Sequence, residues 1–208
     1  MVNLDKISVS FDGVKVIEEF SMNVKRGQKV VISGPSGIGK STILNSILGF
    51  VEIQKGSIEI DKMLLSASTI KQIRAKTAWL PQDLYFKLDS AGDLLFFPFS
   101  FAQNKNHKPT ENEISEMLEN LQLEQNILSK KLDEISGGQK QRVALASQLL
   151  LKKTLLLLDE PTSALDDEAQ NAVIKMLRLK PELTVVSVSH NNNWNKHMDT
   201  IIELKKPS

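Results

Sequence analysis

One segment of the sequence carries the residue types that bind a phosphate chain. Its members are Gly34, Pro35, Ser36, Gly37, Ile38, Gly39, Lys40, Ser41 and, in the predicted helix that follows, Thr42. They fit the P-loop pattern, in which glycines let successive backbone N–H groups point at one anion. We expect the helix N-terminus to add its positive end, Lys40 to reach the terminal phosphates, and Ser41 to ligate Mg²⁺.

Two acidic residues follow an apolar predicted strand, residues 155–158. Asp159 and Glu160 would stand at the carboxyl end of that strand, where ligands collect in open α/β sheets. We expect Asp159 to hold Mg²⁺ through a water, and Glu160, at the mouth of the site, to polarise an attacking water as general base. Without other motifs, the pair is equally typical of a strand that simply runs into a charged turn. Beside a P-loop, that alternative becomes much weaker, and a role in phosphate chemistry is favoured.

A second segment with a serine and glycines opens another predicted helix. Its residues are Ser136, Gly137, Gly138 and Gln139. The first N–H groups of a helix can bind an anion, although such a segment alone is more typical of a loop with a capping serine. A single γ-phosphate does not need two such sites in one subunit.

His190 follows an apolar β-branched run, residues 184–188. An imidazole at the end of a sheet strand can contact a γ-phosphate in its neutral or protonated form. A lone histidine is usually only a satisfied polar residue, but this position favours a role in the site. His107 and His197 have no such context, and we assign them no role.

The elements that position these residues follow from hydrophobic periodicity. Residues 4–24 predict an antiparallel pair around the Asp12-Gly13 turn, and residues 29–33, 57–60, 77–80, 155–158 and 185–188 predict strands. Apolar residues recur at helical spacing in residues 40–50, 139–150 and 166–179. Alternating strands and helices indicate an α/β fold: a P-loop core with a mostly parallel sheet, and an N-terminal antiparallel β-subdomain.

The middle of the chain differs in composition. Residues 85–101 hold five of the eight Phe and the single Tyr, and Thr110 with Glu113 forms a predicted capping box for a helix. We interpret residues 83–134 as an inserted α-helical subdomain. Its aromatic residues Tyr85, Phe86, Phe96, Phe97 and Phe99 are expected to be divided between the subdomain's own core and an exposed interface.

Composition excludes several classes of protein. The 208 residues are 41% hydrophobic, which is too high for a disordered chain, and they include no Cys, so disulfide and thiolate chemistry are excluded. Lys and Arg number 26 against 25 Asp and Glu, so no bulk charge attracts nucleic acid. Residues 1–13 are too charged for a signal peptide, and residues 94–101 and 155–158 are too short to span a membrane.

These motifs stand in the order found in ATP-binding cassette (ABC) proteins, and the resemblance covers essentially the whole chain. Residues 34–41 resemble Walker A, Gln82 the Q-loop, residues 135–139 the signature sequence, and Asp159-Glu160 Walker B with its catalytic acid. His190 matches the switch histidine, and the D-loop matches Ser163, Ala164, Leu165 and Asp166. Ile135 replaces the usual Leu of the signature, and Asn191 stands where many members have Asp.

The resemblance implies one ABC ATPase domain over residues 1–208, in which 1–82 and 135–208 form a RecA-like core with the β-subdomain. It implies a homodimer closed head to tail on ATP binding, with the P-loop of one copy facing Ser136 to Gln139 of the other. Two ATP molecules with Mg²⁺ would lie between them, which gives the second anion site its purpose. Gln82 would sense Mg²⁺ and the attacking water. Phe11 would stack on adenine, with a core-facing strand residue as the alternative.

The resemblance also implies an integral membrane transporter subunit that docks near Tyr85 to Phe101, on the cytoplasmic face of the cell membrane. A soluble ABC ATPase that acts in iron-sulfur cluster assembly or in another non-transport role is the alternative, and nucleic-acid partners are not expected. Within transporters, residues 93–99 are most similar to the small iron-export or metal-stress exporters. Lipoprotein-release and macrolide-type exporters are close rivals. The membrane subunit would choose the cargo.

Overall fold

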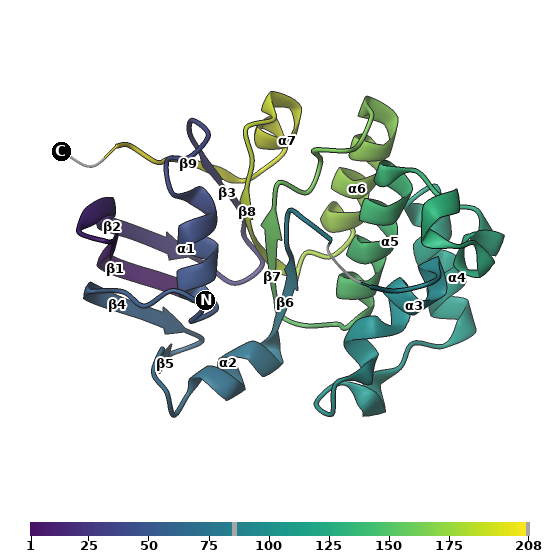
Figure 1. The fold of residues 1–208 in the computed structure, drawn as a ribbon, viewed down its shortest axis with the longest axis horizontal. Helices are drawn as coiled ribbons and strands as arrows, with labels where there is room; N and C mark the ends of the chain where they lie inside the picture. Colours follow the sequence, from purple (N-terminus) through teal and green to yellow (C-terminus); the bar gives the residue numbers. More distant parts are fainter. Residues whose placement is uncertain (85–86, 207–208) are drawn as a thin grey trace.

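The computed structural model describes residues 1–84 and 87–206 of the chain. Two β-sheets lie side by side, with one helix between them and a group of helices on the far side of the second sheet (Figure 1). Tyr85 and Phe86, two of the predicted interface aromatics, lie outside the described residues. Within the described part of the chain, no helix has the length and apolar character needed to cross a membrane.

The first sheet is antiparallel and has the strand order β2-β1-β4-β5. Its strands are β1 (Val2–Phe11), β2 (Val14–Val24), β4 (Lys55–Ile60) and β5 (Met63–Leu64). Asp12 and Gly13 connect β1 and β2 with positive φ angles of 49° and 79°, the backbone form that a two-residue hairpin turn needs. The hairpin predicted at Asp12-Gly13 is therefore confirmed.

The second sheet is fully parallel and has the order β6-β7-β8-β3-β9. Its strands are β3 (Lys29–Ser33), β6 (Thr77–Leu80), β7 (Leu155–Asp159), β8 (Thr184–Val188) and β9 (Thr200–Glu203). Every residue of β7 and β8 is buried, because both faces of the sheet are covered. The α/β class is confirmed, while β5 and β9 were not predicted.

Alternate residues of the parallel sheet belong to two different cores. Leu155 and Leu157 pack on one face with α1 (Lys40–Ile47) and the antiparallel sheet. Leu156 and Leu158 pack on the other face with the large helical layer. The period of two along a strand thus makes one strand bind two layers together.

Helix α1 is shorter than the predicted 40–50. It ends at Ile47, because Gly49 takes a left-handed φ of 64°, the usual way for a chain to leave a helix. Helix α2 (Ile70–Lys76), which was not predicted, leads into β6.

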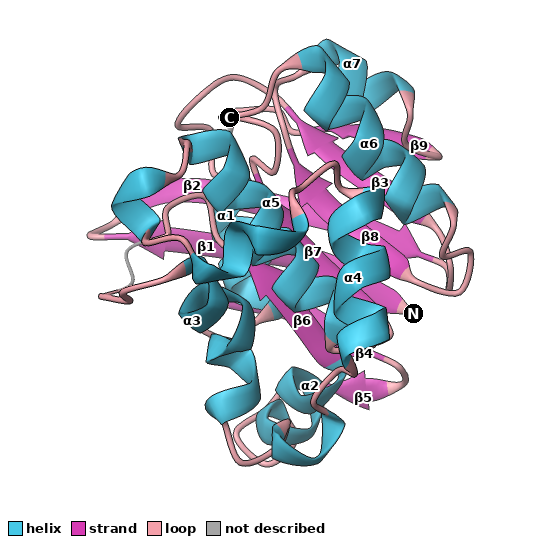
Figure 2. Cartoon of the chain, turned by 90° about the vertical axis from the view of Figure 1, so that its right-hand side faces the viewer, coloured by secondary structure: helices cyan, strands magenta, loops and turns pink. Residues whose placement is uncertain are grey.

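The remaining helices form the helical layer beyond the other face of the parallel sheet (Figure 2), some of them packed on the sheet and others mainly on those helices. Between β6 and α5 lie α3 (Ala91–Phe96), α4 (Glu111–Asn120) and the 3-10 turns Phe97–Ser100, Lys105–His107, Gln125–Ser129 and Leu132–Glu134. Then follow α5 (Gly137–Leu150), α6 (Asp167–Arg178) and the short α7 (Asn192–Lys196). The capping box at Thr110 and Glu113 is confirmed by both of its hydrogen bonds, of 3.3 and 2.9 Å.

Candidate active site

The P-loop lies between the end of β3 and the first turn of α1, as the sequence predicts. Gly37 and Gly39 have φ angles of 75° and 106°, which residues with a Cβ rarely adopt. Gly39 also lies against β2, where a Cβ would come within 2.8 Å of Val16 Cγ1. Backbone conformation requires glycine at both positions, and packing against β2 requires it at Gly39.

The ammonium group of Lys40 lies inside this loop. The side chain is buried, and Nζ donates to the carbonyl oxygens of Gly34 at 2.9 Å and Pro35 at 3.0 Å. A buried cation at the N-terminus of α1 adds to the positive end of the helix dipole, so an anion is favoured here on two grounds.

Ser41 and Asp159 meet across 118 residues of sequence. Ser41 Oγ donates a hydrogen bond of 3.0 Å to Asp159 Oδ1. A hydroxyl and a carboxylate, both oxygen donors, fit the ligands that Mg²⁺ takes beside a substrate phosphate. Burial raises the pKa of Asp159, the nearby Glu160 charge adds to the rise, and the bond from Ser41 opposes it.

This pKa direction predicts a pH-dependent stability difference. The folded chain holds more protons than the unfolded chain between the unfolded and folded pKa values of Asp159, so its unfolding free energy falls as pH rises through that window. Asp159→Asn keeps an acceptor for Ser41 and removes the charge. We expect the variant without nucleotide to gain stability over wild type as pH rises above about 4, measured by urea unfolding. If the unfolding free energy of Asp159→Asn fell relative to that of wild type as pH rises, this prediction would be wrong.

Glu160 and His190 form a contact that sequence reasoning missed. His190 Nδ1 lies 3.0 Å from Glu160 Oε1, and the His190 backbone N donates to Oε2 at 3.4 Å. Glu160 is only 8% exposed, so it is deeper than the predicted position at the mouth of the site, while most of the His190 side chain is exposed. The exposed ring covers the buried carboxylate because β7 and β8 are neighbours and end at the same edge of the sheet.

A cavity of about 690 Å³ joins these residues, a size that fits a nucleotide. Its lining includes Phe11, Gln82, Glu160 and His190 beside residues of the P-loop, and also Val16, which was not predicted. Phe11 is 48% exposed, so the alternative of a core-facing strand residue is wrong.

Residues 136–139 lie outside that cavity. Ser136 caps α5: its Oγ accepts from Gln139 N at 3.1 Å, and Gln139 Oε1 accepts from Ser136 N at 2.9 Å. The capping role is thus present, and it starts the helix earlier than the predicted residue 139. Ser136 and Gly137 are exposed.

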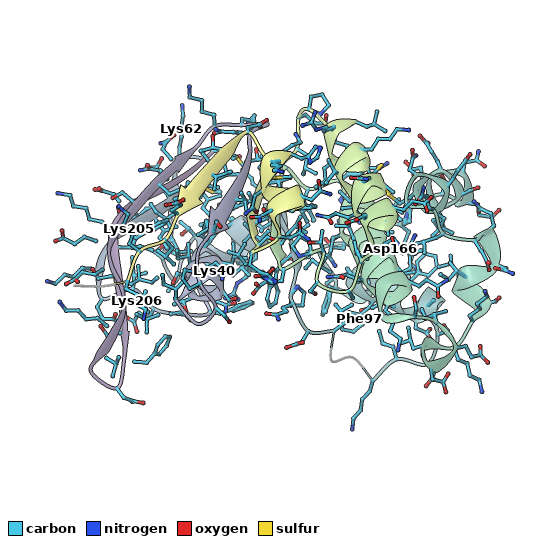
Figure 3. The ribbon with its side chains drawn as sticks, turned by 90° about the horizontal axis from the view of Figure 1, so that it is seen from above. Lys40, Lys62, Phe97, Asp166, Lys205 and Lys206 are labelled. Carbon is cyan, nitrogen blue, oxygen red and sulfur yellow. The ribbon has the colours of Figure 1, made fainter. Side chains whose placement is uncertain are left out.

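The loop of residues 163–166 follows Glu160 and leads into α6. Asp166 caps α6 by accepting from Ala169 N at 2.8 Å. Figure 3 shows Lys40 on the side of the β-sheets and Asp166 on the side of the helices. One chain therefore brings Gln82, Glu160 and His190 to the P-loop cavity, with Asp159 bonded to Ser41 of the loop, and leaves the segment 136–139 apart from them.

The fold and cavity define an α/β nucleotide-binding protein with a P-loop, and comparisons define its family. Residues 17–163 match the ABC transporter family. The glutamine transport ATP-binding protein GlnQ of Escherichia coli (strain K12) is 33% identical over 91% of this chain and 81% of its own. The probable iron export ATP-binding protein FetA of the same organism is 28% identical over 99% of this chain and 91% of its own.

A solved structure gives the same result for the fold. The ATP-binding cassette MJ0796, in a dimeric post-hydrolysis state bound to ADP and Pi, has a TM-score of 0.87 and 30% sequence identity, covering 99% of this chain and 94% of its own. The chain belongs to the ABC transporter family. It has the P-loop cassette fold and is an ATPase that binds ATP with Mg²⁺.

Proposed function

We propose that two copies of this chain close head to tail around two MgATP and power a membrane transporter from its cytoplasmic face. One observation carries the proposal: the P-loop cavity and the exposed N-terminus of α5, each expected to bind an anion, lie apart in a single chain. Opposed copies would bring each cavity against the other's Ser136. The dimeric state of the cassette MJ0796 supports this arrangement.

In this proposal the residues predicted from the sequence divide the binding of ATP and Mg²⁺ among them. Lys40 and the P-loop amides bind the terminal phosphates, and a second copy's Ser136, Gly137, Gly138 and Gln139 bind them from the other side. Ser41, Gln82 and, through a water, Asp159 would hold Mg²⁺, which would supply positive charge beside the phosphates. Phe11, exposed beside the cavity, stacks on adenine.

Glu160 is the proposed general base, and His190 its neighbour at the γ-phosphate. The imidazole of His190 bonds one oxygen of the carboxylate and the His190 backbone N bonds the other, so both oxygens are oriented where Glu160 lines the cavity. A buried and oriented carboxylate can hold an attacking water in line with the phosphate. The residues 163–166 would then lie at the dimer interface, next to this base.

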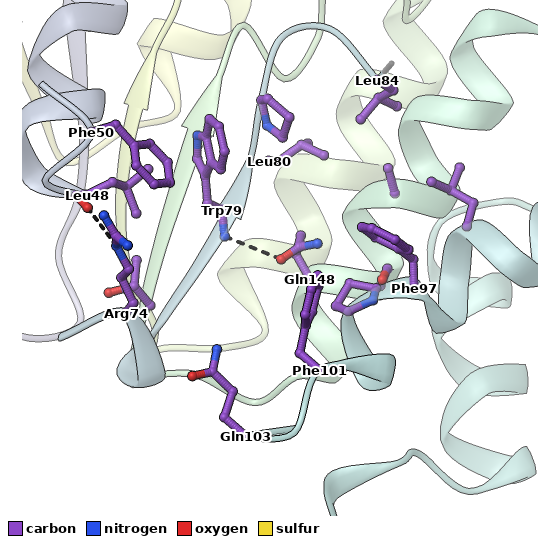
Figure 4. A pocket seen from close by; sticks show the side chains of 16 residues that line it. Leu48, Phe50, Arg74, Trp79, Leu80, Leu84, Phe97, Phe101, Gln103 and Gln148 are labelled. Atoms are coloured by element: carbon purple, nitrogen blue, oxygen red, sulfur yellow. Dashed lines mark hydrogen bonds between the residues drawn. The ribbon is translucent and has the colours of Figure 1, made fainter. Parts of the chain in front are cut away.

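A groove of about 430 Å³ provides the proposed docking site for the membrane subunit (Figure 4). Trp79, Phe97 and Phe101 line it, together with Phe50 and Arg74. Side chains from residues 94–101, within the segment predicted for docking, line one wall of this groove, and Phe50, Arg74 and Trp79 come from residues 1–82. Phe99 is buried in the helical layer and serves the subdomain's own packing.

The opposite wall of the groove is built around Arg74. Its Nε donates to Leu48 O at 2.9 Å, and its guanidinium lies 4.6 Å from the centre of the Phe50 ring. Phe50 in turn lies against Trp79, with ring centroids 5.4 Å apart. An apolar groove with one cation and several aromatic rings suits an amphipathic helix of the partner.

Replacing one exposed ring tests the docking site. Phe101 is 49% exposed and lines the groove, whereas Phe96 is 38% exposed and does not line it. We expect a multi-span membrane protein, identified by mass spectrometry, to copurify with the tagged wild-type chain in detergent from its native host. The tagged Phe101→Ser variant should not retain that protein. Phe96→Ser should retain that protein.

The same purification tests the wider proposal. Recovery of the wild-type chain without any membrane protein would favour the soluble iron-sulfur assembly role instead. The cargo stays a prediction: FetA, named for iron export, aligns over nearly the whole chain, and GlnQ, named for glutamine transport, is 33% identical over 91% of it. The sequence of the recovered membrane subunit would test iron export directly.

A further inference from the structure

One buried amide joins the first turns of α5 to the chain that follows β7. Gln141 is 6% exposed. Its Nε2 donates to the carbonyl oxygen of Glu160 at 3.1 Å, and its Oε1 accepts from the backbone N of Ala164 at 3.2 Å. The amide nitrogen and the amide oxygen of Gln141 therefore both bond the backbone of one short loop, residues 160–164.

The amide is one of three groups that hold the backbone of Glu160 in that loop. Glu160 has a φ of 46°, a conformation uncommon for a residue with a Cβ. Its backbone is held by Val188 O, which accepts from Glu160 N at 3.0 Å, and by Ser163 N, which donates to Glu160 O at 3.2 Å. Gln141 supplies the remaining bond to the Glu160 carbonyl, from a different element of the fold.

The first turn of α5 and the loop that contains Ala164 also pack in direct contact. A Cβ at Gly138 would lie 2.7 Å from the carbonyl oxygen of Ala164, closer than real contacts allow. A displacement of the first turn of α5 therefore pushes directly on Ala164, and Gln141 carries the same displacement to Glu160.

We propose that Gln141 is a positioning residue that couples the two ATP sites of the dimer. This rests on the proposed head-to-tail arrangement, in which residues 136–139 bind the second copy's nucleotide and Glu160 serves this chain's own. Engagement of the first site then moves the helix that holds Gln141. Through its two hydrogen bonds, the amide sets the backbone of Glu160 for hydrolysis at the second site.

Gln141→Met, of similar length but without polar atoms, removes both bonds. We expect kcat for ATP to fall about tenfold or more, because small displacements of a catalytic group have large effects on rate. The ATP Kd should stay within about twofold, since Gln141 does not line the cavity. The Hill coefficient for ATP should fall to about one. Gln141→Glu, which keeps the acceptor for Ala164 and loses the donor to Glu160, should lower kcat in the same direction.

Gln125→Met is the matched control. It removes an amide-to-carbonyl bond of 3.1 Å, from Gln125 to Ser115, on an exposed part of the helical layer, and should leave kcat and the Hill coefficient unchanged. A wild-type kcat in both Gln141 variants would overturn the proposal. So would a lower kcat with an unchanged Hill coefficient, or a parallel loss of ATP affinity. A wild-type chain that hydrolyses ATP with a Hill coefficient of one and forms no dimer with ATP would instead overturn the proposed head-to-tail arrangement.

Discussion

Glu160→Gln is expected to lower kcat for ATP hydrolysis by at least about a hundredfold, the scale of a lost general base. The Kd for ATP should change by no more than about twofold, because the amide has nearly the same shape and removes a negative charge close to the phosphates. The variant should therefore bind ATP and accumulate as a closed dimer. Steady-state kinetics, ATP titration and size-exclusion chromatography with ATP measure the three effects.

The matched control for this variant is Glu182→Gln. Glu182 is exposed and lies just before β8, at the opposite end of that strand from His190. Its replacement should leave both kcat and dimer formation as in wild type. If Glu160→Gln hydrolysed ATP at the wild-type rate, the assignment of Glu160 as base would be wrong, whatever the state of the P-loop.

Lys40→Ala is expected to act on binding itself. The ammonium lies inside the P-loop with two carbonyl oxygens around it, where it can turn to a phosphate oxygen. Charge-assisted hydrogen bonds contribute about 1.5–3 kcal/mol each, so we expect the ATP Kd to rise about ten- to a hundredfold. Direct titration with a fluorescent ATP analogue and competition by ATP measure the change.

Lys71→Ala removes a positive charge at an exposed position of α2 and controls for net charge. Its ATP affinity should equal that of wild type at the same ionic strength. An unchanged affinity in Lys40→Ala would remove the basis for the P-loop interpretation. A loss in both variants would mean that long-range charge, and not the contact, sets the affinity.

Local signals explain which elements could be predicted. The strands at residues 29–33, 77–80 and 155–158 were found because β-branched or leucine-rich runs end at glycine, proline or acidic residues. Helix α1 was predicted too long, since apolar spacing continues past Gly49 and only its positive φ ends the helix. The strand β9 was missed because its neighbour β3 lies far back in the sequence, and pairing with β3 makes it a strand.

The chemistry of the site was readable in the sequence because each motif is a short run with a fixed order of residue types. Phosphate binding needs consecutive backbone N–H groups, so the P-loop has to be continuous, and a strand end can present only adjacent acidic residues. The P-loop at residues 34–42 therefore indicated phosphate chemistry by itself, whereas residues 159–160 and 136–139 did so only together with the P-loop and the order of the motifs.

Only the tertiary structure decided how those motifs act on one another. The contact of His190 with Glu160, the two bonds of Gln141, and the groove between Phe50 and Phe101 all join residues well apart in the chain. Such contacts depend on strand order and on helix packing, which no local pattern encodes. The sequence determined an ATP-hydrolysing cassette. The fold decided that its P-loop and its residues 136–139 face different places, because they stand at the N-termini of helices packed on opposite faces of one sheet.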